Sequence, residues 1–100
     1  VLVNANVVIN AQSKICKGVI LNTGAIIEHE CKIGDFSHIG PGAVICGNVN
    51  IGERTFVGSN TVIKQGVNIG NNVTIGAGSV IIKDIADNKK VVGNPGKIIN

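Results

Sequence analysis

Every sixth residue between Val3 and Ile81 is a large aliphatic, and this spacing is the dominant pattern of the chain. The series comprises Val3, Ile9, Ile15, Leu21, Ile27, Ile33, Ile39, Ile45, Ile51, Val57, Ile63, Ile69, Ile75 and Ile81. Two positions before each aliphatic stands a small or β-branched residue, such as Val19 or Thr55. Residues two apart lie on one face of a strand, so each hexad predicts a short strand with two inward side chains.

The residues between the predicted strands are rich in Gly and Asn. Gly directly follows the aliphatic at positions 34, 40, 52, 58, 70 and 76. We expect the Gly or Asn after the aliphatic to take positive φ and so to form sharp corners. Three hexads close a triangle, which places residues 18 apart about 4.8 Å from each other in successive coils. The pattern therefore predicts an all-β solenoid of about five triangular coils over residues 1–84.

The six-residue pattern ends after residue 84. Residues 85–90 are typical of a polar loop, Val91 and Val92 of one further strand, and residues 93–97 of a turn cluster. We expect residues 85–100 to form a loop and a C-terminal segment that caps the open end of the solenoid, because solenoids need capped ends. The chain begins at Val1 in mid-pattern, which predicts that it is a piece of a longer protein.

Composition narrows the classes of function. The apolar content is mainly Ile (17) and Val (14), with only two aromatic residues, so a helical bundle is disfavoured. The net charge is +3 and the basic residues are spread thinly without aromatic platforms, which disfavours a nucleic-acid partner. No apolar run approaches the roughly 18 residues of a membrane span. Three cysteines without a CxxC motif favour a reducing compartment, the cytoplasm.

The two histidines are the candidate chemical groups. His29 lies in a predicted corner between Glu28 and Glu30, and a neighbouring carboxylate orients an imidazole as a general base requires. Gly47 follows 18 residues later, one coil above His29, where its N–H is a candidate donor to an oxyanion. His38 points outward from a flat face half a coil away from His29. A site that uses both histidines would therefore lie between two subunits.

Each of these features has a simpler interpretation. Histidines on a solenoid surface are commonly solvated and inert, and corners commonly contain glycine. Pro41, Ser59 and Ala77 form a ridge of small corner residues, which would accept a thin extended ligand or would merely reflect the preference of corners for small residues. On the residues alone, these alternatives remain open.

The sequence resembles the hexapeptide-repeat family of left-handed β-helix acetyltransferases, on the repeat as a whole and on two local motifs. Residues 22–30 (NTGAIIEHE) and 33–39 (IGDFSHI) resemble the sugar acetyltransferase branch, which includes UDP-4-amino-sugar N-acetyltransferases and sialic acid O-acetyltransferase-like proteins. The closing residues 93–97 (GNPGK) are similar to the GNPAK ending of that family, with Gly96 in place of Ala. The left-handedness of the solenoid is implied by this resemblance.

The resemblance implies roles for particular residues. His29 would be the general base, with Glu30 raising its basicity. His38 would contact acetyl-CoA, the Gly47 amide would lie near the acetyl carbonyl, and Ser59 and Ala77 would contact the CoA arm. Lys89, Lys90 and Lys97 are weaker candidates for phosphate contacts, since solvated lysines are common. No metal is implied.

The resemblance also implies a function and an assembly. We expect a homotrimer with sites between subunits, in which His29 activates an amino-sugar for direct attack on acetyl-CoA without a covalent enzyme intermediate. The outward apolar residues fit this assembly, since they would be buried by oligomerisation: Ile20, Ile26, Val44, Phe56, Val62 and Val80. The N-terminal nucleotide-sugar domain of full-length relatives is absent from these residues.

Other functions stay open at this point. A sugar or sialic acid O-acetyltransferase would use the same base, and a catalytically incomplete trimerisation scaffold would use none. A zinc carbonic anhydrase of this fold needs three histidine ligands, whereas this chain has two. An ice-binding solenoid needs regular Thr ladders on a flat face, which the irregular outward positions do not provide.

Overall fold

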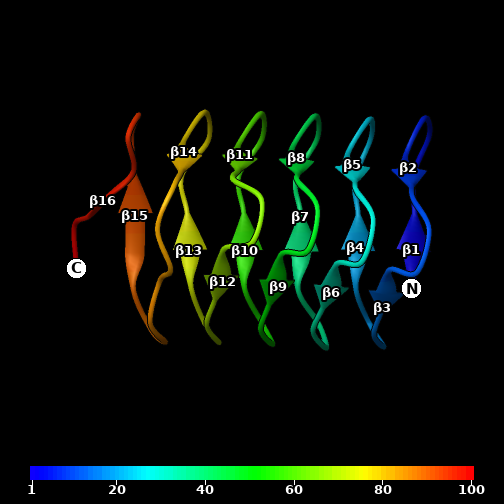
Figure 1. Cartoon of the computed structure of the whole chain (residues 1–100), viewed down its shortest axis with the longest axis horizontal. Helices are drawn as coiled ribbons and strands as arrows, with labels where there is room; N and C mark the ends of the chain where they lie inside the picture. The colour runs from blue at the N-terminus through cyan, green and yellow to red at the C-terminus, as the bar shows by residue number, and fades with distance from the viewer.

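The chain winds into a triangular prism of short parallel strands, as described by a computed structural model of residues 1–100 (Figure 1). The prism measures 30 × 20 × 20 Å. The chain forms no helix that is long and apolar enough to cross a membrane. This all-β solenoid confirms the fold class predicted from the hexads.

Three sheets form the faces of the prism. The first face contains β1 (Leu2–Val3), β4 (Ile20–Leu21), β7 (His38–Ile39), β10 (Phe56–Val57), β13 (Thr74–Ile75), β15 (Lys90–Val92) and β16 (Lys97–Ile98). The second contains β2 (Val8–Ile9), β5 (Ile26–Ile27), β8 (Val44–Ile45), β11 (Val62–Ile63) and β14 (Val80–Ile81). The third contains β3 (Lys14–Ile15), β6 (Lys32–Ile33), β9 (Asn50–Ile51) and β12 (Asn68–Ile69).

Parallel pairing holds successive coils in an 18-residue register. His38 pairs with Phe56, and Phe56 pairs with Thr74, along the first face. The first corner, between the first and second faces, comprises residues 4–6, 22–24, 40–42, 58–60 and 76–78. The second, between the second and third faces, comprises residues 10–12, 28–30, 46–48 and 64–66. The third, between the third and first faces, comprises residues 16–18, 34–36, 52–54, 70–72 and 86–88.

The aliphatic column fills the prism. Leu21, Ile27, Ile33, Ile39 and Ile45 are fully buried, and the same column stays buried as far as Ile81. Each such side chain contributes about 2 kcal/mol through removal of its apolar surface from water. Regular burial of the column explains why a strict six-residue repeat specifies the fold.

The corners differ from the sequence expectation in one respect. The residue with positive φ is the last of each corner, for example Asn6, Gln12, Glu30 or Arg54, and not the glycine directly after the aliphatic. That glycine has a packing reason instead. A β-carbon at Gly34 would lie 2.6 Å from the carbonyl oxygen of Gly52 in the next coil. Glycine is therefore required there for the close approach of stacked coils.

The last coil is shorter than the others. Ile85 is buried and bridges to Ile69, and Val91 pairs with Ile75, so both pairs are 16 residues apart. Coil stacking thus continues past residue 84 through the segment expected to be a polar loop. This coil is two residues shorter than the others, and within it the side chain of Asp84 accepts a hydrogen bond from the Asn68 N–H (2.8 Å).

The C-terminal tail adds an edge strand. β16 pairs antiparallel with β15, and Ile98 and Ile99 remain 58% and 62% exposed. An apolar hollow of about 240 Å³ lies beside the tail, lined by residues that include Ile81, Ile85 and Val91. The tail therefore lies alongside the end of the core and leaves this hollow next to it.

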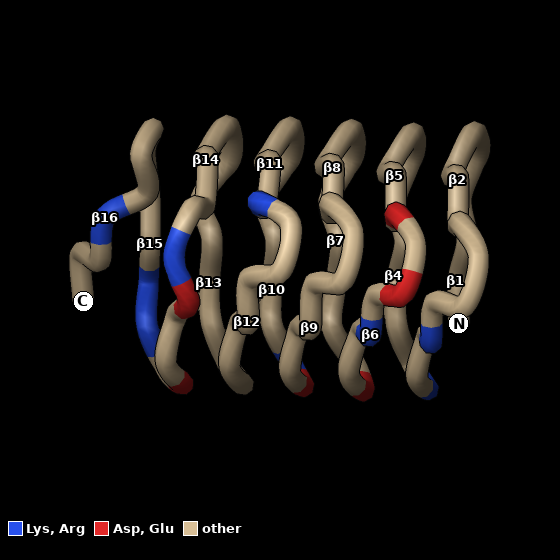
Figure 2. The backbone as a smooth tube through the Cα atoms, in the orientation of Figure 1, with Lys and Arg blue, Asp and Glu red and all other residues tan.

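The outer surfaces of the three faces differ in chemistry. The second face is aliphatic throughout, the first is mixed, and the third is polar. The outward residues of the second face are Val8, Ile26, Val44, Val62 and Val80, and those of the third are Lys14, Lys32, Asn50 and Asn68. Charged residues gather on the second and third corners, whereas the first corner, at the top of the view, has none (Figure 2).

Candidate functional site

His29 lies at the second corner, directly below Gly47 of the next coil. Its Nδ1 is 3.2 Å from Glu30 Oε1, and both side chains are about half exposed. A β-carbon at Gly47 would be 2.6 Å from His29 Nε2 and 2.8 Å from Cε1. The backbone continues the stack, since the Asn48 N–H donates to the His29 carbonyl at 2.9 Å. The predicted base, its carboxylate and the predicted amide therefore lie together.

The carboxylate determines which ring nitrogen of His29 carries the proton. An ionised Glu30 only accepts hydrogen bonds, so neutral His29 places its proton on Nδ1. The lone pair is then on Nε2, the atom that faces Gly47. The N–H of Gly47 has no acceptor within the chain. This corner therefore combines a proton acceptor with an adjacent unused donor.

His38 lies on the outer surface of the first face, on β7. Its ring meets the Phe56 ring edge-on, with 5.2 Å between the centroids and 89° between the planes. Its Nε2 is 3.3 Å from Asn22 Nδ2. The sequence pattern alone does not indicate that Asn22 contacts His38. The available signal was the 18-residue spacing of Asn4 and Asn22, whose amides are hydrogen-bonded at 2.9 Å.

Ser59 and Ala77 lie in the first corner, which borders the face that carries His38. They occupy successive coils, and the Gly78 N–H donates to the Ser59 carbonyl at 2.8 Å. The N–H groups of Ser59 and Ala77 have no acceptor within the chain. The ridge expected from the spacing is therefore present and offers unpaired backbone donors.

The three candidate phosphate contacts lie toward the C-terminal end of the prism. Lys90 belongs to β15 and Lys97 to β16, both on the first face, and Lys89 precedes β15. All three are outside any salt bridge in the chain.

Within one chain, the predicted site residues form two separate groups. His29, Glu30 and Gly47 lie at the second corner, whereas His38 lies on the first face, which is opposite that corner in the triangle. Ser59 and Ala77 belong to the side of His38. The two groups do not meet within one chain.

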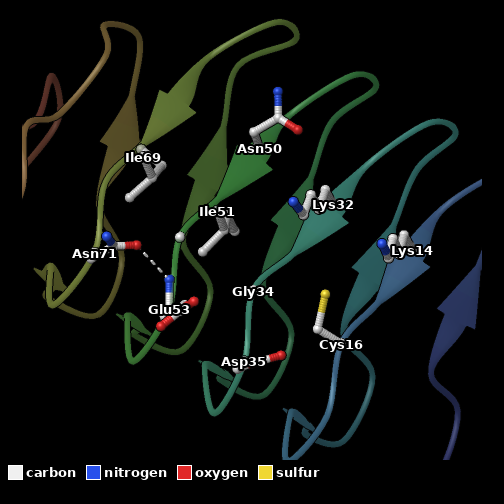
Figure 3. A pocket seen from close by; sticks show the side chains of 11 residues that line it. Lys14, Cys16, Lys32, Gly34, Asp35, Asn50, Ile51, Glu53, Ile69 and Asn71 are labelled. Atoms are coloured by element: carbon white, nitrogen blue, oxygen red, sulfur yellow. Dashed lines mark hydrogen bonds between the residues drawn. The ribbon is translucent and has the colours of Figure 1, made fainter.

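The largest hollow lies elsewhere, on the outer surface of the third face and the adjoining third corner (Figure 3). Its volume is about 420 Å³ and it contains neither histidine. Lys14 and Lys32 line it on the third face, and Asp35 and Glu53 line it at the third corner. The Asn71 side chain accepts a 2.8 Å hydrogen bond from the Glu53 N–H. No group of three or more His, Cys, Asp or Glu side chains is arranged to hold a metal ion.

Solved structures of sugar acetyltransferases are similar to this chain. A variant of GDP-perosamine N-acetyltransferase from Caulobacter crescentus, in complex with CoA and GDP-perosamine, is 34% identical with a TM-score of 0.91, over 99% of this chain and 53% of that one. The acetyltransferase domain of PglB from Neisseria gonorrhoeae, in complex with acetyl coenzyme A, is 34% identical with a TM-score of 0.76, over 98% and 54%.

A third similar structure is named as an O-acetyltransferase. It is a maltose O-acetyltransferase from Clostridium difficile, 26% identical with a TM-score of 0.80, over 99% of this chain and 70% of that one. The chain spans about half the length of the two N-acetyltransferase structures. No curated protein sequence matches it.

The family described as bacterial transferase hexapeptide (six repeats) matches three overlapping segments, residues 13–47, 30–65 and 48–83. Together they cover most of the prism, including both histidines. The buried aliphatic column and the triangular coils are the structural counterpart of that repeat. The chain therefore belongs to the bacterial transferase hexapeptide family, with a left-handed β-helix fold and a likeness to sugar N-acetyltransferases.

Proposed function

We propose that this chain is the acetyl-transfer part of an acetyl-CoA-dependent amino-sugar N-acetyltransferase. The observation that carries the proposal is the second corner, where His29 Nε2 faces Gly47 while Nδ1 is engaged by Glu30 at 3.2 Å. A general base needs an unprotonated nitrogen directed at its substrate. The similar structures with bound CoA or acetyl coenzyme A support the donor assignment.

The proposed reaction is a direct transfer. His29 Nε2 removes a proton from the acceptor amine as the amine nitrogen attacks the thioester carbonyl carbon. A C–N bond forms, and the Gly47 N–H donates a hydrogen bond to the resulting oxyanion. The C–S bond then breaks with its electron pair on sulfur, and the proton held by His29 passes to the CoA thiolate. His38, Ser59 and Ala77 bind the donor.

We propose a homotrimer, because the two halves of the site lie on opposite sides of one chain. The aliphatic second face provides a surface for association, with Val8 and Val62 at 46% and 36% exposure in the single chain. This face borders the second corner, so its burial against a neighbour would bring His29 toward the neighbour's first face, which carries His38. The expected mass in solution is three times the 10.3 kDa of the chain.

The acceptor in this proposal is a nucleotide-linked amino-sugar, the substrate class of the GDP-perosamine N-acetyltransferase structures. O-acetylation of a sugar is the second candidate, favoured by the similarity to maltose O-acetyltransferase. A hydroxyl would lose its proton to the same His29 nitrogen. The proposed location is the cytoplasm, which is supported by three cysteines that form no disulfide.

Calorimetric titration with acetyl-CoA tests the donor half. We expect one site per subunit, weakened in His38→Ala and unchanged in His29→Ala and in Lys32→Ala, a control on the third face. A transfer assay then tests the base, with amino-sugar and hydroxyl acceptors offered in parallel. His29→Ala should lower the rate by about 10²- to 10⁴-fold. Absence of acetyl-CoA binding by a verified trimer would favour a scaffold and contradict the proposal.

A further inference from the structure

Asn22 holds His38 from the coil below. Asn22 begins the first corner directly after β4, and His38 is on β7 of the next coil; on the first face β4 lies beside β7 and β7 beside β10 (Figure 1). Asn22 Nδ2 is 3.3 Å from His38 Nε2, while the Phe56 ring lies edge-on to the imidazole from the coil above. The ring of His38 is thus contacted on two sides.

The orientation of the Asn22 amide is determined by a backbone group. The Thr23 N–H donates to Asn22 Oδ1 at 2.8 Å, and an N–H only donates, so the atom that it meets must be oxygen. Asn4 Nδ2 donates to the same oxygen at 2.9 Å. The other end of the amide, which faces His38, is therefore the NH2 group.

A donor at that position determines the proton position on neutral His38. Because Asn22 Nδ2 donates, His38 Nε2 accepts with its lone pair, and the ring proton is on Nδ1. No acceptor in the chain contacts His38 Nδ1. His29 has the same Nδ1–H form for a different reason, since Glu30 accepts from it. The consequence is opposite: His29 offers a lone pair, and His38 offers an N–H.

We propose that Asn22, supported by Asn4, is a positioning residue that keeps His38 as a hydrogen-bond donor toward the acetyl donor. The role of His38 toward that donor rests on the proposed function, whereas the proton position rests on geometry alone. In the opposite tautomer, a proton on Nε2 would point at the Asn22 NH2 group, and two donors would face each other. A free Nδ1–H is suited to the carbonyl or amide oxygens of an acyl-CoA.

The direct test is nitrogen-15 NMR of the histidine rings in the whole chain at a pH where they are neutral. We expect His38 to show a protonated Nδ1 and an unprotonated Nε2. In Asn22→Asp the new carboxylate only accepts, so the proton should move to Nε2. Asn22→Ala removes the donor and should give a mixture of the two forms. A wild-type Nε2–H form, or an unchanged tautomer in Asn22→Asp, would overturn the proposal.

A matched control is available on the third face. Asn50 donates to Asn68 Oδ1 at 3.1 Å, an amide pair like Asn4 and Asn22 but without a histidine. Asn50→Asp should leave the His38 tautomer unchanged. For transfer activity, we expect Asn22→Asp to lower kcat by about 10²- to 10³-fold with little change in KM for the acceptor, since one donor to the acyl group is lost. If the wild type shows the expected tautomer but no transfer, the proposed function fails, whereas the control of the His38 proton position by Asn22 stands.

Discussion

The imidazole of His29 occupies the space that a side chain at Gly47 would need. Two ring atoms lie 2.6 and 2.8 Å from the β-carbon position of Gly47, closer than any real β-carbon tolerates. The φ of Gly47 is not positive, so this glycine is not required by its backbone conformation. The absence of a side chain at Gly47 leaves room for the imidazole of His29. Glycine at this corner is therefore explained by the candidate base and not by the turn.

Gly47→Ala should separate activity from stability. The methyl group would displace the exposed imidazole, which can swing into solvent at little cost, so the fold should persist. We expect kcat/KM to fall about 10²-fold while the melting temperature changes little. Gly66→Ala is the converse control, because its β-carbon meets nothing within 4 Å but its φ is +80°. That variant should lose about 1 kcal/mol of stability and keep its activity.

Glu30→Gln should weaken the base without disturbing the corner. Gln12 occupies the equivalent position one coil earlier at φ +62°, close to the +59° of Glu30, so glutamine fits this backbone. Loss of the carboxylate charge should lower kcat about tenfold, because the imidazolium formed during transfer loses its partner. Steady-state kinetics at saturating acetyl-CoA would measure this. Glu28→Gln serves as the control, and an equal loss there would argue against a specific role for Glu30.

Val44→Asp should dissociate the proposed trimer. Val44 lies at the centre of the aliphatic second face, and an unpaired carboxylate buried in an interface costs several kcal/mol. We expect light scattering to show a monomer and the transfer activity to disappear, since each site would need two subunits. Asn50→Asp in the same coil on the third face should remain trimeric. A fully active monomeric Val44→Asp would remove the proposed intersubunit site.

Cys31 should be the least reactive of the three thiols. Burial raises the pKa of Cys31 above its ordinary value of 9.0, and its Sγ donates to the Cys46 carbonyl at 3.1 Å. Iodoacetamide should therefore label Cys16 and Cys46 in the folded protein and Cys31 only on unfolding. Mass spectrometry of the labelled peptides would check this order.

The same pKa shift predicts how stability depends on pH. Above about pH 9 the unfolded chain loses the Cys31 proton while the folded chain retains it, so stability should fall as pH rises. Denaturant titrations at pH 8 and pH 10 would measure the fall. Cys31→Val should reduce it, since Val49 occupies the stacked position in the next coil. An identical pH dependence in both proteins would contradict the prediction.

The hexad pattern predicts the prism well because each strand repeats one local arrangement. The inward column, the 18-residue register and the proximity of His29 to Gly47 all follow from counting. The last coil departs from the count, since Ile85 and Val91 follow their partners by 16 residues. The sequence contains this 16-residue spacing, from Ile69 to Ile85 and from Ile75 to Val91. A search restricted to a fixed six-residue repeat does not detect it.

The contact of Asn22 with His38 could not be predicted from the repeat. Its two residues are 16 apart and on different elements, a corner and a strand, and the contact depends on side-chain rotamers. The reason for the six glycines that directly follow an aliphatic could not be predicted either, because the clearance between stacked coils is a property of the assembled prism. The sequence therefore predicts which candidate residues lie close together, whereas the proton positions follow only from the side-chain geometry.

The stacking of coils has a consequence for how the protein melts. Each coil touches only the coil above and the coil below, so unfolding is expected to proceed inward from the ends, as in a one-dimensional lattice. Val3 and Ile9, at one end, are 48% and 42% exposed although they belong to the inward column. His29 lies one coil further in, and His38 and Gly47 lie two coils further in. Exchange should therefore be slowest for the hydrogen-bonded strand amides of the middle coils, such as that of His38, which donates to the Thr55 carbonyl at 2.9 Å. The strands that carry the candidate site would be among the last parts of the molecule to lose their order.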